Sequence, residues 1–277
     1  MLPVADSDPD NQPGPTSEGI ARLAGFAASL ADSAGQPWAG REFQRNAFDD
    51  DDGLAPTPLL DALAQFREGR SGPEAVVDAL RDCRVLVPLV AEAGAQHGAH
   101  TGLNADASQE LSLVTVAGPD GRTLLPIFSS VDAMSAWNSH ARPIPVSAER
   151  AALAAVSDGT DLLILDPTSP NTEFAVRRPA LWALAQGISW VPSDRDPSVL
   201  HAFRETVVDA HDVQALSLAP GDPSSRLLSE ELLVRLRLAP GLSAQRVREL
   251  LAVLTQRWSA NDTIATRVDS LRLEVDG

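Results

Sequence analysis

The sequence predicts an α+β fold, with a mixed β-sheet domain and flanking helices followed by a smaller C-terminal ββαβ unit. First, short apolar runs bounded by Pro, Gly and Asp turns alternate with amphipathic helical patterns up to about residue 190. Second, two strands, one long helix and a final strand follow in that order. Because 277 residues suit about two domains, we expect an irregular acidic segment at 1–53, an α+β domain at 54–190 and a ββαβ domain at 191–277.

The N-terminal part is expected to begin with little regular structure. Residues 1–19 are rich in Pro, Asp, Ser and Gly without apolar periodicity, which is typical of a disordered tail. Two helices should follow the acidic segment. The first is expected to begin at Thr57-Pro58, with Thr57 as its N-cap. The second is expected after Ser71, whose spacing to Glu74 matches a capping box.

The sheet of the first domain is predicted from apolar runs with turn residues around them, at Val85–Val90, Leu111–Val116, Leu124–Phe128 and Leu162–Leu165. Pro119-Asp120-Gly121 predicts a hairpin-like turn before the third run. Pro88 lacks a backbone donor, so the first run is expected at a sheet edge or a strand end. Helical patterns accompany these strands and are expected at 131–137, capped by Ser130, at 148–156, at 179–186 and from 197 onwards.

The C-terminal unit shows the clearest pattern. Apolar and polar residues alternate along Leu232–Leu238 and Leu271–Val275, as is typical of an antiparallel sheet with one wet face. Val213–Leu218 is the third strand of this expected sheet. The helix Ala244–Trp258 carries apolar residues at helical spacing, so we expect it to cover the apolar face.

The composition excludes several classes of function. The formal net charge is -16 and no dense Lys/Arg cluster offsets it, so we expect no binding to nucleic acid. The chain has no lysine, which excludes a Walker A loop and Schiff-base chemistry. Its single cysteine, Cys83, excludes an internal disulfide. Because the N-terminus lacks a secretory signal and no apolar run is long enough to span a membrane, we expect a cytoplasmic protein with no membrane contact.

Three patterns resemble chemical sites without meeting their requirements. His97 and His100 offer metal ligands, but their Gly- and Ala-rich surroundings favour a mobile loop. The acidic stretch 48–53 lacks the ligand positions of a calcium-binding loop. Leu162–Asp166 is similar to a Walker B strand, but without a Walker A loop Asp166 is expected to stabilise a turn. We therefore predict no catalytic, cofactor-binding or metal-binding residues, and no cofactor.

Several packing and turn motifs follow one another in the first domain, namely Leu86-Val87-Pro88-Leu89-Val90, Leu113-Val114-Thr115-Val116, Leu125-Pro126-Ile127-Phe128-Ser129, Arg142-Pro143-Ile144-Pro145-Val146, Leu163-Ile164-Leu165-Asp166-Pro167 and Arg178-Pro179-Ala180-Leu181-Trp182. Together they resemble the N-terminal domain of the SseB family, the enhanced serine sensitivity proteins, in its actinobacterial form. The resemblance brings no settled catalytic residue. One departure is the loop 96–102, which is usually strongly charged in that family and here is rich in His, Gly and Ala.

Two groups of residues are candidates for an interaction surface. Trp137 and Trp182 each lie on a short predicted helix beside Pro and Arg residues, among them Arg142, as recognition aromatics often do. The alternative is that both rings attach helices to the sheet. The second group lies on the polar face of the C-terminal sheet and comprises Leu233, Arg235, Arg237 and Arg272. Its arginines either dock an acidic partner or second copy, or pair internally with Glu231 or Glu274.

These observations favour a non-enzymatic interaction or regulatory protein that binds another protein or a second copy of itself. A small-molecule (amino-acid) sensor is the alternative that the name of the family suggests. An enzyme of unknown class, using scattered His and acidic residues, is the third hypothesis.

Overall fold

The computed structural model describes residues 48, 50–91, 111–160 and 162–276. The predicted tail and the loop with His97 and His100 lie outside these ranges. The mixed α+β fold is confirmed, and residues 50–277 fall within one compact unit. The boundary near residue 190 stays a prediction. Among the described residues, no helix combines the length and the apolar character that crossing a membrane requires.

One sheet of the first part has the order β2-β1-β5, with both pairings antiparallel. Its strands are β1 (Arg84–Ala91), β2 (Leu111–Leu113) and β5 (Arg142–Ser147). The expectation that Pro88 marks an edge or a strand end was wrong, because β1 is the middle strand. Pro88 instead lies opposite Pro143 of β5, so two residues without a backbone donor share one position of the ladder.

A second sheet has the order β3-β4-β6-β7, in which β4 and β6 run parallel and the other neighbours antiparallel. Its strands are β3 (Val116–Ala117), β4 (Thr123–Ile127), β6 (Leu163–Leu165) and β7 (Phe174–Val176). The predicted run Leu111–Val116 is thus divided between two sheets. The predicted turn joins β3 to β4, and Gly121 takes a φ of 81° that an L side chain rarely adopts.

Five helices accompany these sheets in the described residues, namely α2 (Thr57–Arg67), α3 (Pro73–Arg81), α4 (Val131–Trp137), α5 (Ala148–Ser157) and α6 (Arg178–Ala185). Apolar residues of α2, α3, α5 and α6 form one core with β1, β4, β6 and β7. The expected capping box was wrong, because Gly72 is the N-cap of α3 and no described side chain forms a capping hydrogen bond there. Glu74 instead forms an ion pair with Arg195, far along the chain.

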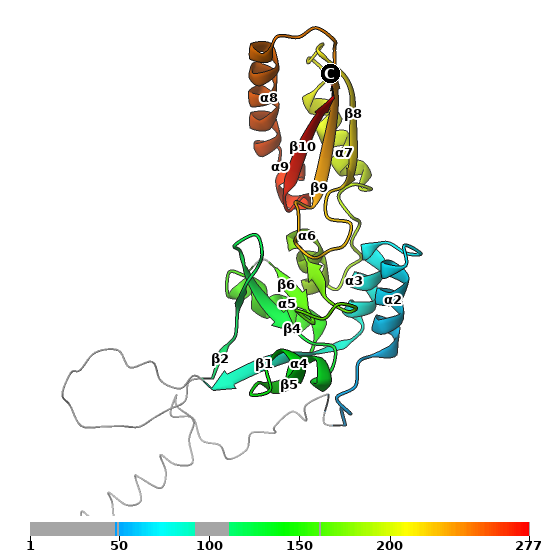
Figure 1. Ribbon diagram of the computed structural model, residues 1–277, viewed down its shortest axis with the longest axis vertical. Helices are drawn as coiled ribbons and strands as arrows, with labels where there is room; N and C mark the ends of the chain where they lie inside the picture. The colour runs from blue at the N-terminus through cyan, green and yellow to red at the C-terminus, as the bar shows by residue number, and fades with distance from the viewer. Residues whose placement is uncertain (1–47, 49, 92–110, 161, 277) are drawn as a thin grey trace, which may run out of the picture. The chain divides into compact units, whose positions relative to one another are not determined.

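The C-terminal unit contains α7 (Pro197–Thr206), β8 (Val213–Pro220), β9 (Leu232–Leu238), α8 (Ala244–Ser259), α9 (Asp262–Arg267) and β10 (Leu271–Asp276). Figure 1 shows β8, β9 and β10 side by side with α8 and α9 close to them. The strand order is β10-β9-β8. The expectation of an antiparallel sheet was wrong for β10, which runs parallel to β9, whereas β8 runs antiparallel to β9, so the sheet is mixed. Such a parallel pairing needs a crossover, which α8 and α9 supply.

The C-terminal sheet has one covered and one open face. Alternate residues of β9 form a core with the apolar residues of α7, α8 and α9. Trp258 of α8 packs edge-on against Phe203 of α7, with ring centroids 5.3 Å apart, and its Nε1 donates to the Thr206 hydroxyl at 2.8 Å. Arg235 and Arg237 lie on the opposite face and are exposed. The predicted alternation along β9 is therefore confirmed from Val234 onwards.

Candidate functional site

Trp182 is a large aromatic side chain that remains exposed on a short, well-packed helix. Arg177 is the N-cap of α6 and Pro179 lies in its first turn, where a missing backbone donor costs nothing. Leu181 and Leu184 on the same helix are fully buried. The Trp182 side chain, on another face of α6, is 49% exposed. The helix thus holds the ring in place without covering it.

The chain turns sharply after α6 and brings further apolar side chains beside Trp182. Gly187 takes a φ of 66°, and the Ile188 amide donates to the Ala183 carbonyl at 3.0 Å, which closes the helix end. Ile188 is 53% exposed and Val191 is 50% exposed. With Trp182 and Trp190 they line a groove of about 470 Å³. The end of α9 also contributes to this groove.

Two arginines at the groove are fixed by partners in the C-terminal unit. Arg178 Nη2 donates to the backbone carbonyls of Ala265 and Val268, each at 2.9 Å. Arg267 Nη1 lies 2.7 Å from Asp196 Oδ2, at the N-cap of α7. Both guanidinium groups line the groove with their partners already bound. The result is a groove with an apolar centre and a preorganised polar rim, a combination found at protein interfaces.

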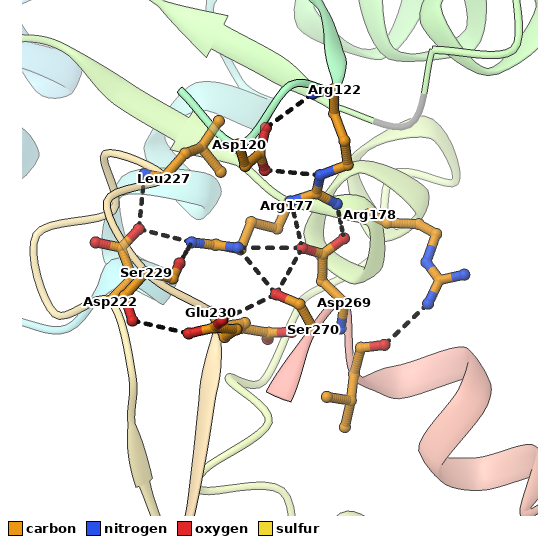
Figure 2. A network of polar contacts seen from close by, with 12 residues as sticks. Asp120, Arg122, Arg177, Arg178, Asp222, Leu227, Ser229, Glu230, Asp269 and Ser270 are labelled. Carbon is orange, nitrogen blue, oxygen red and sulfur yellow. Dashed lines mark hydrogen bonds and ion pairs between the residues drawn. The ribbon is translucent and has the colours of Figure 1, made fainter. Parts of the chain in front are cut away.

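A buried network of charged side chains lies at the start of α6, around its N-cap residue Arg177 (Figure 2). Arg177 Nη2 lies 2.7 Å from Asp222 Oδ2, and its Nη1 lies 3.1 Å from Asp269 Oδ2. Arg122, from the turn between β3 and β4, donates hydrogen bonds to both carboxylate oxygens of Asp269, at 2.9 and 3.0 Å. The side chains of Arg177, Asp222 and Asp269 are all less than a tenth exposed. This network therefore fixes α6 against the segments that precede β9 and β10.

Two neighbouring carboxylates in this region have pKa values that are shifted in opposite directions. Burial raises the pKa of Asp269, but hydrogen bonds and charge from Arg122 and Arg177 outweigh it and hold the pKa below its ordinary value. Glu231 lies close by, and among the described residues it forms no ion pair with an arginine. Its carboxylate accepts hydrogen bonds from Ser193 Oγ at 2.9 Å and from the Asp269 amide at 2.5 Å. Burial is the larger effect and raises the pKa of Glu231 to about 7.

The structure gives different surroundings to the two tryptophans that the sequence singled out. Trp137 is half-buried at the end of α4, and its ring packs against Phe128 with centroids 5.2 Å apart. It attaches the helix to the sheet, as the alternative interpretation holds. Trp182 is the exposed one. Arg142 is exposed on β5 and does not line the groove.

The polar face of the C-terminal sheet holds the remaining predicted residues. Arg235 Nε lies 3.2 Å from Glu274 Oε2, and Arg272 Nη2 lies 3.4 Å from the other oxygen of the same carboxylate. Arg237 is exposed. Leu233 was expected on the exposed surface, but its side chain is only 4% exposed, so it is corrected to a buried residue. The seven predicted surface residues therefore do not form one site.

The patterns that resembled chemical sites have structural roles where they are described. Asp166 accepts hydrogen bonds from the Ser129 amide at 2.8 Å and the Ser129 hydroxyl at 2.7 Å. It begins the turn after β6 with a φ of 44°. Asp51 forms an ion pair with Arg84. The described residues hold no group of three or more His, Cys, Asp or Glu arranged for a metal ion.

Comparison with known proteins shows which protein family part of the chain resembles. Residues 59–183 match the family model described as SseB protein N-terminal domain. The matched range runs from α2 into α6 and includes Trp182, whereas the end of α9 on the groove lies beyond it. No curated protein and no solved structure matches the chain.

Proposed function

This chain carries the N-terminal domain of the SseB family, and we propose that it is a non-enzymatic protein that binds another protein through the groove beside Trp182. The observation that carries the proposal is the 49% exposure of Trp182 on a rigid helix, with Ile188 and Val191 half-exposed next to it. A partner protein bound here would cover this apolar surface. Tryptophan is among the side chains that contribute most to the binding free energy when an interface buries them.

The surroundings of the ring support an interface for a protein. Arg178 and Arg267 are held by Ala265, Val268 and Asp196, so binding would order few additional side chains. We further propose that binding regulates or recruits the partner without any chemical step. A cytoplasmic location stays a prediction.

The test is affinity capture from the native host with wild-type protein and two variants. Trp182→Ala should lose the captured partner, because the ring supplies the centre of the groove. Leu153→Ala is the matched control, since Leu153 is 47% exposed on α5 and does not line the groove. It should retain the partner. Equal capture by all three proteins would rule out the groove as the binding surface.

Small-molecule sensing is the second candidate, because a groove of about 470 Å³ has the size of many ligand sites. A panel of amino acids in a thermal-shift assay separates the two. A ligand at one hundred times its dissociation constant should stabilise the protein by about 2.7 kcal/mol. A shift that Trp182→Ala abolishes would favour the sensor over the protein-binding function.

A further inference from the structure

The two edge strands of the C-terminal sheet differ in how readily each can pair with a further strand. Within the described ranges β10 pairs only with β9, and β8 forms the other edge. β8 has a register irregularity between Val213 and Ala215 and ends at Pro220, features that discourage further strand pairing. β10 runs for six residues without a proline. It is therefore the edge that can accept another strand.

The direction of the backbone groups decides which residues of β10 can pair. The Ser270 carbonyl accepts the Leu232 amide of β9, so Ser270 points its backbone groups towards β9. Because successive residues of a strand point in opposite directions, the backbone groups of Leu271, Leu273 and Val275 point away from β9. These three residues present their amides and carbonyls at the open edge.

The charges of β10 select one register for a two-fold antiparallel pairing. Centring the pair on Leu273 places Arg272 opposite Glu274 of the second copy, and the two-fold axis repeats this contact. Centring it on Glu274 would place two Glu274 carboxylates opposite each other, and centring it on Arg272 would oppose two arginines. Opposite charges across a strand pair stabilise it and like charges destabilise it. A shift by a single residue would exchange the covered and open faces.

We propose that β10 pairs antiparallel with β10 of a second copy of this chain, in the register centred on Leu273. In this register Leu273 faces its own counterpart and Leu271 faces Val275, so apolar residues meet on the covered side of a six-stranded sheet. Val275 is 38% exposed in the single chain and would be covered. The contact is short, and a dimer with a micromolar or weaker dissociation constant follows from its size.

Sedimentation velocity over a concentration series, up to about 0.5 mM, measures this association. Arg272→Glu should weaken it by about tenfold or more, because both symmetric contacts become repulsive. Glu274→Arg should do the same. Arg248→Glu makes the same change of charge on the exposed surface of α8 and serves as the control. Circular dichroism establishes that each variant is folded.

Mixing the two variants gives the decisive result. The introduced glutamate at position 272 of one copy then faces the introduced arginine at position 274 of the other, and the native residues at these positions form the second contact. The mixture should recover association that each variant alone has lost. The proposal is overturned if the wild-type protein stays monomeric over the series, if Arg248→Glu weakens association equally, or if the mixture does not associate.

Discussion

Arg177 Nη2 lies 2.7 Å from Asp222 Oδ2, and 45 residues of sequence separate these two buried side chains. The same guanidinium group reaches Asp269 through Nη1, so one arginine forms ion pairs with two buried carboxylates. The contact joins the start of α6 to the segment that follows β8. It therefore links the helix that carries Trp182 to the C-terminal unit.

Replacing Arg177 should destabilise the protein strongly. Arg177→Met leaves Asp222 without its charged partner and Asp269 with Arg122 alone. Removing one member of a buried ion pair typically costs about 3–5 kcal/mol. Urea denaturation measures the loss. Arg195→Met is the control, because Arg195 pairs with Glu74 at an exposed position and should cost less than about 1 kcal/mol. Similar losses in both variants would contradict a structural role for the buried network.

Glu231 should make stability depend on pH. Its pKa is raised from 4.5 to about 7 in the folded protein, so the folded state holds this proton more tightly than the unfolded chain. The resulting stabilisation is fully present below about pH 4.5 and is lost as the pH rises through about 7. Glu231→Gln stays uncharged and keeps an oxygen for the Asp269 amide. Its stability should fall less between about pH 5 and about pH 8 than that of the wild type.

Denaturation midpoints at several pH values measure this difference. At about pH 8 the variant should be the more stable protein, by up to about 3 kcal/mol. Glu230→Gln at the exposed neighbouring position should leave the wild-type profile in place. Parallel profiles for wild type and Glu231→Gln would show that Glu231 is ionised at an ordinary pH.

The two tryptophans should respond in opposite ways to the same substitution. Trp137→Ala removes a ring that packs against Phe128, and truncation of a core tryptophan costs about 3 kcal/mol or more when the site is well packed. Because Trp137 is only half-buried, a value near the lower end is expected. Trp182→Ala should change the unfolding free energy by less than about 1 kcal/mol. A large loss for Trp182→Ala would assign that ring to the fold.

The open face of the C-terminal sheet can be tested apart from the groove. Changing Arg235 and Arg237 together to Glu removes an exposed ion pair with Glu274 and should alter stability by less than about 1 kcal/mol. The double change adds negative charge beside β10, so self-association should weaken. Partner capture through the Trp182 groove should persist. Loss of stability instead would mean that these arginines are structural.

Local patterns in the sequence predicted the elements well and their partners less well. The predicted strand Leu232–Leu238 agrees with β9, and the predicted helix Ala244–Trp258 agrees with α8 to one residue. Alternation shows which side chains share a face, but it does not show whether a neighbouring strand is parallel. For that reason β10 was expected to be antiparallel and is parallel.

The candidate site was predicted only in part for a similar reason. Trp182 was identified because a tryptophan beside Arg and Pro is a recognisable local signal. Ile188 and Val191 gave no such signal, since isolated apolar residues after a helix are common. Arg177 was missed as a structural residue because its carboxylate partners lie 45 and 92 residues away. Their convergence depends on the tertiary fold.

Photo-crosslinking in the native host tests whether a partner protein occupies the groove beside Trp182. A photoreactive amino acid replaces Ile188, which is 53% exposed beside Trp182, or Leu153, which is 47% exposed on α5. A covalent adduct with a partner protein is expected from position 188 and should disappear when Trp182→Ala is added, whereas no such adduct is expected from position 153. The same adducts from both positions, or an adduct from position 188 that persists with Trp182→Ala, would rule out the groove beside Trp182 as the binding surface.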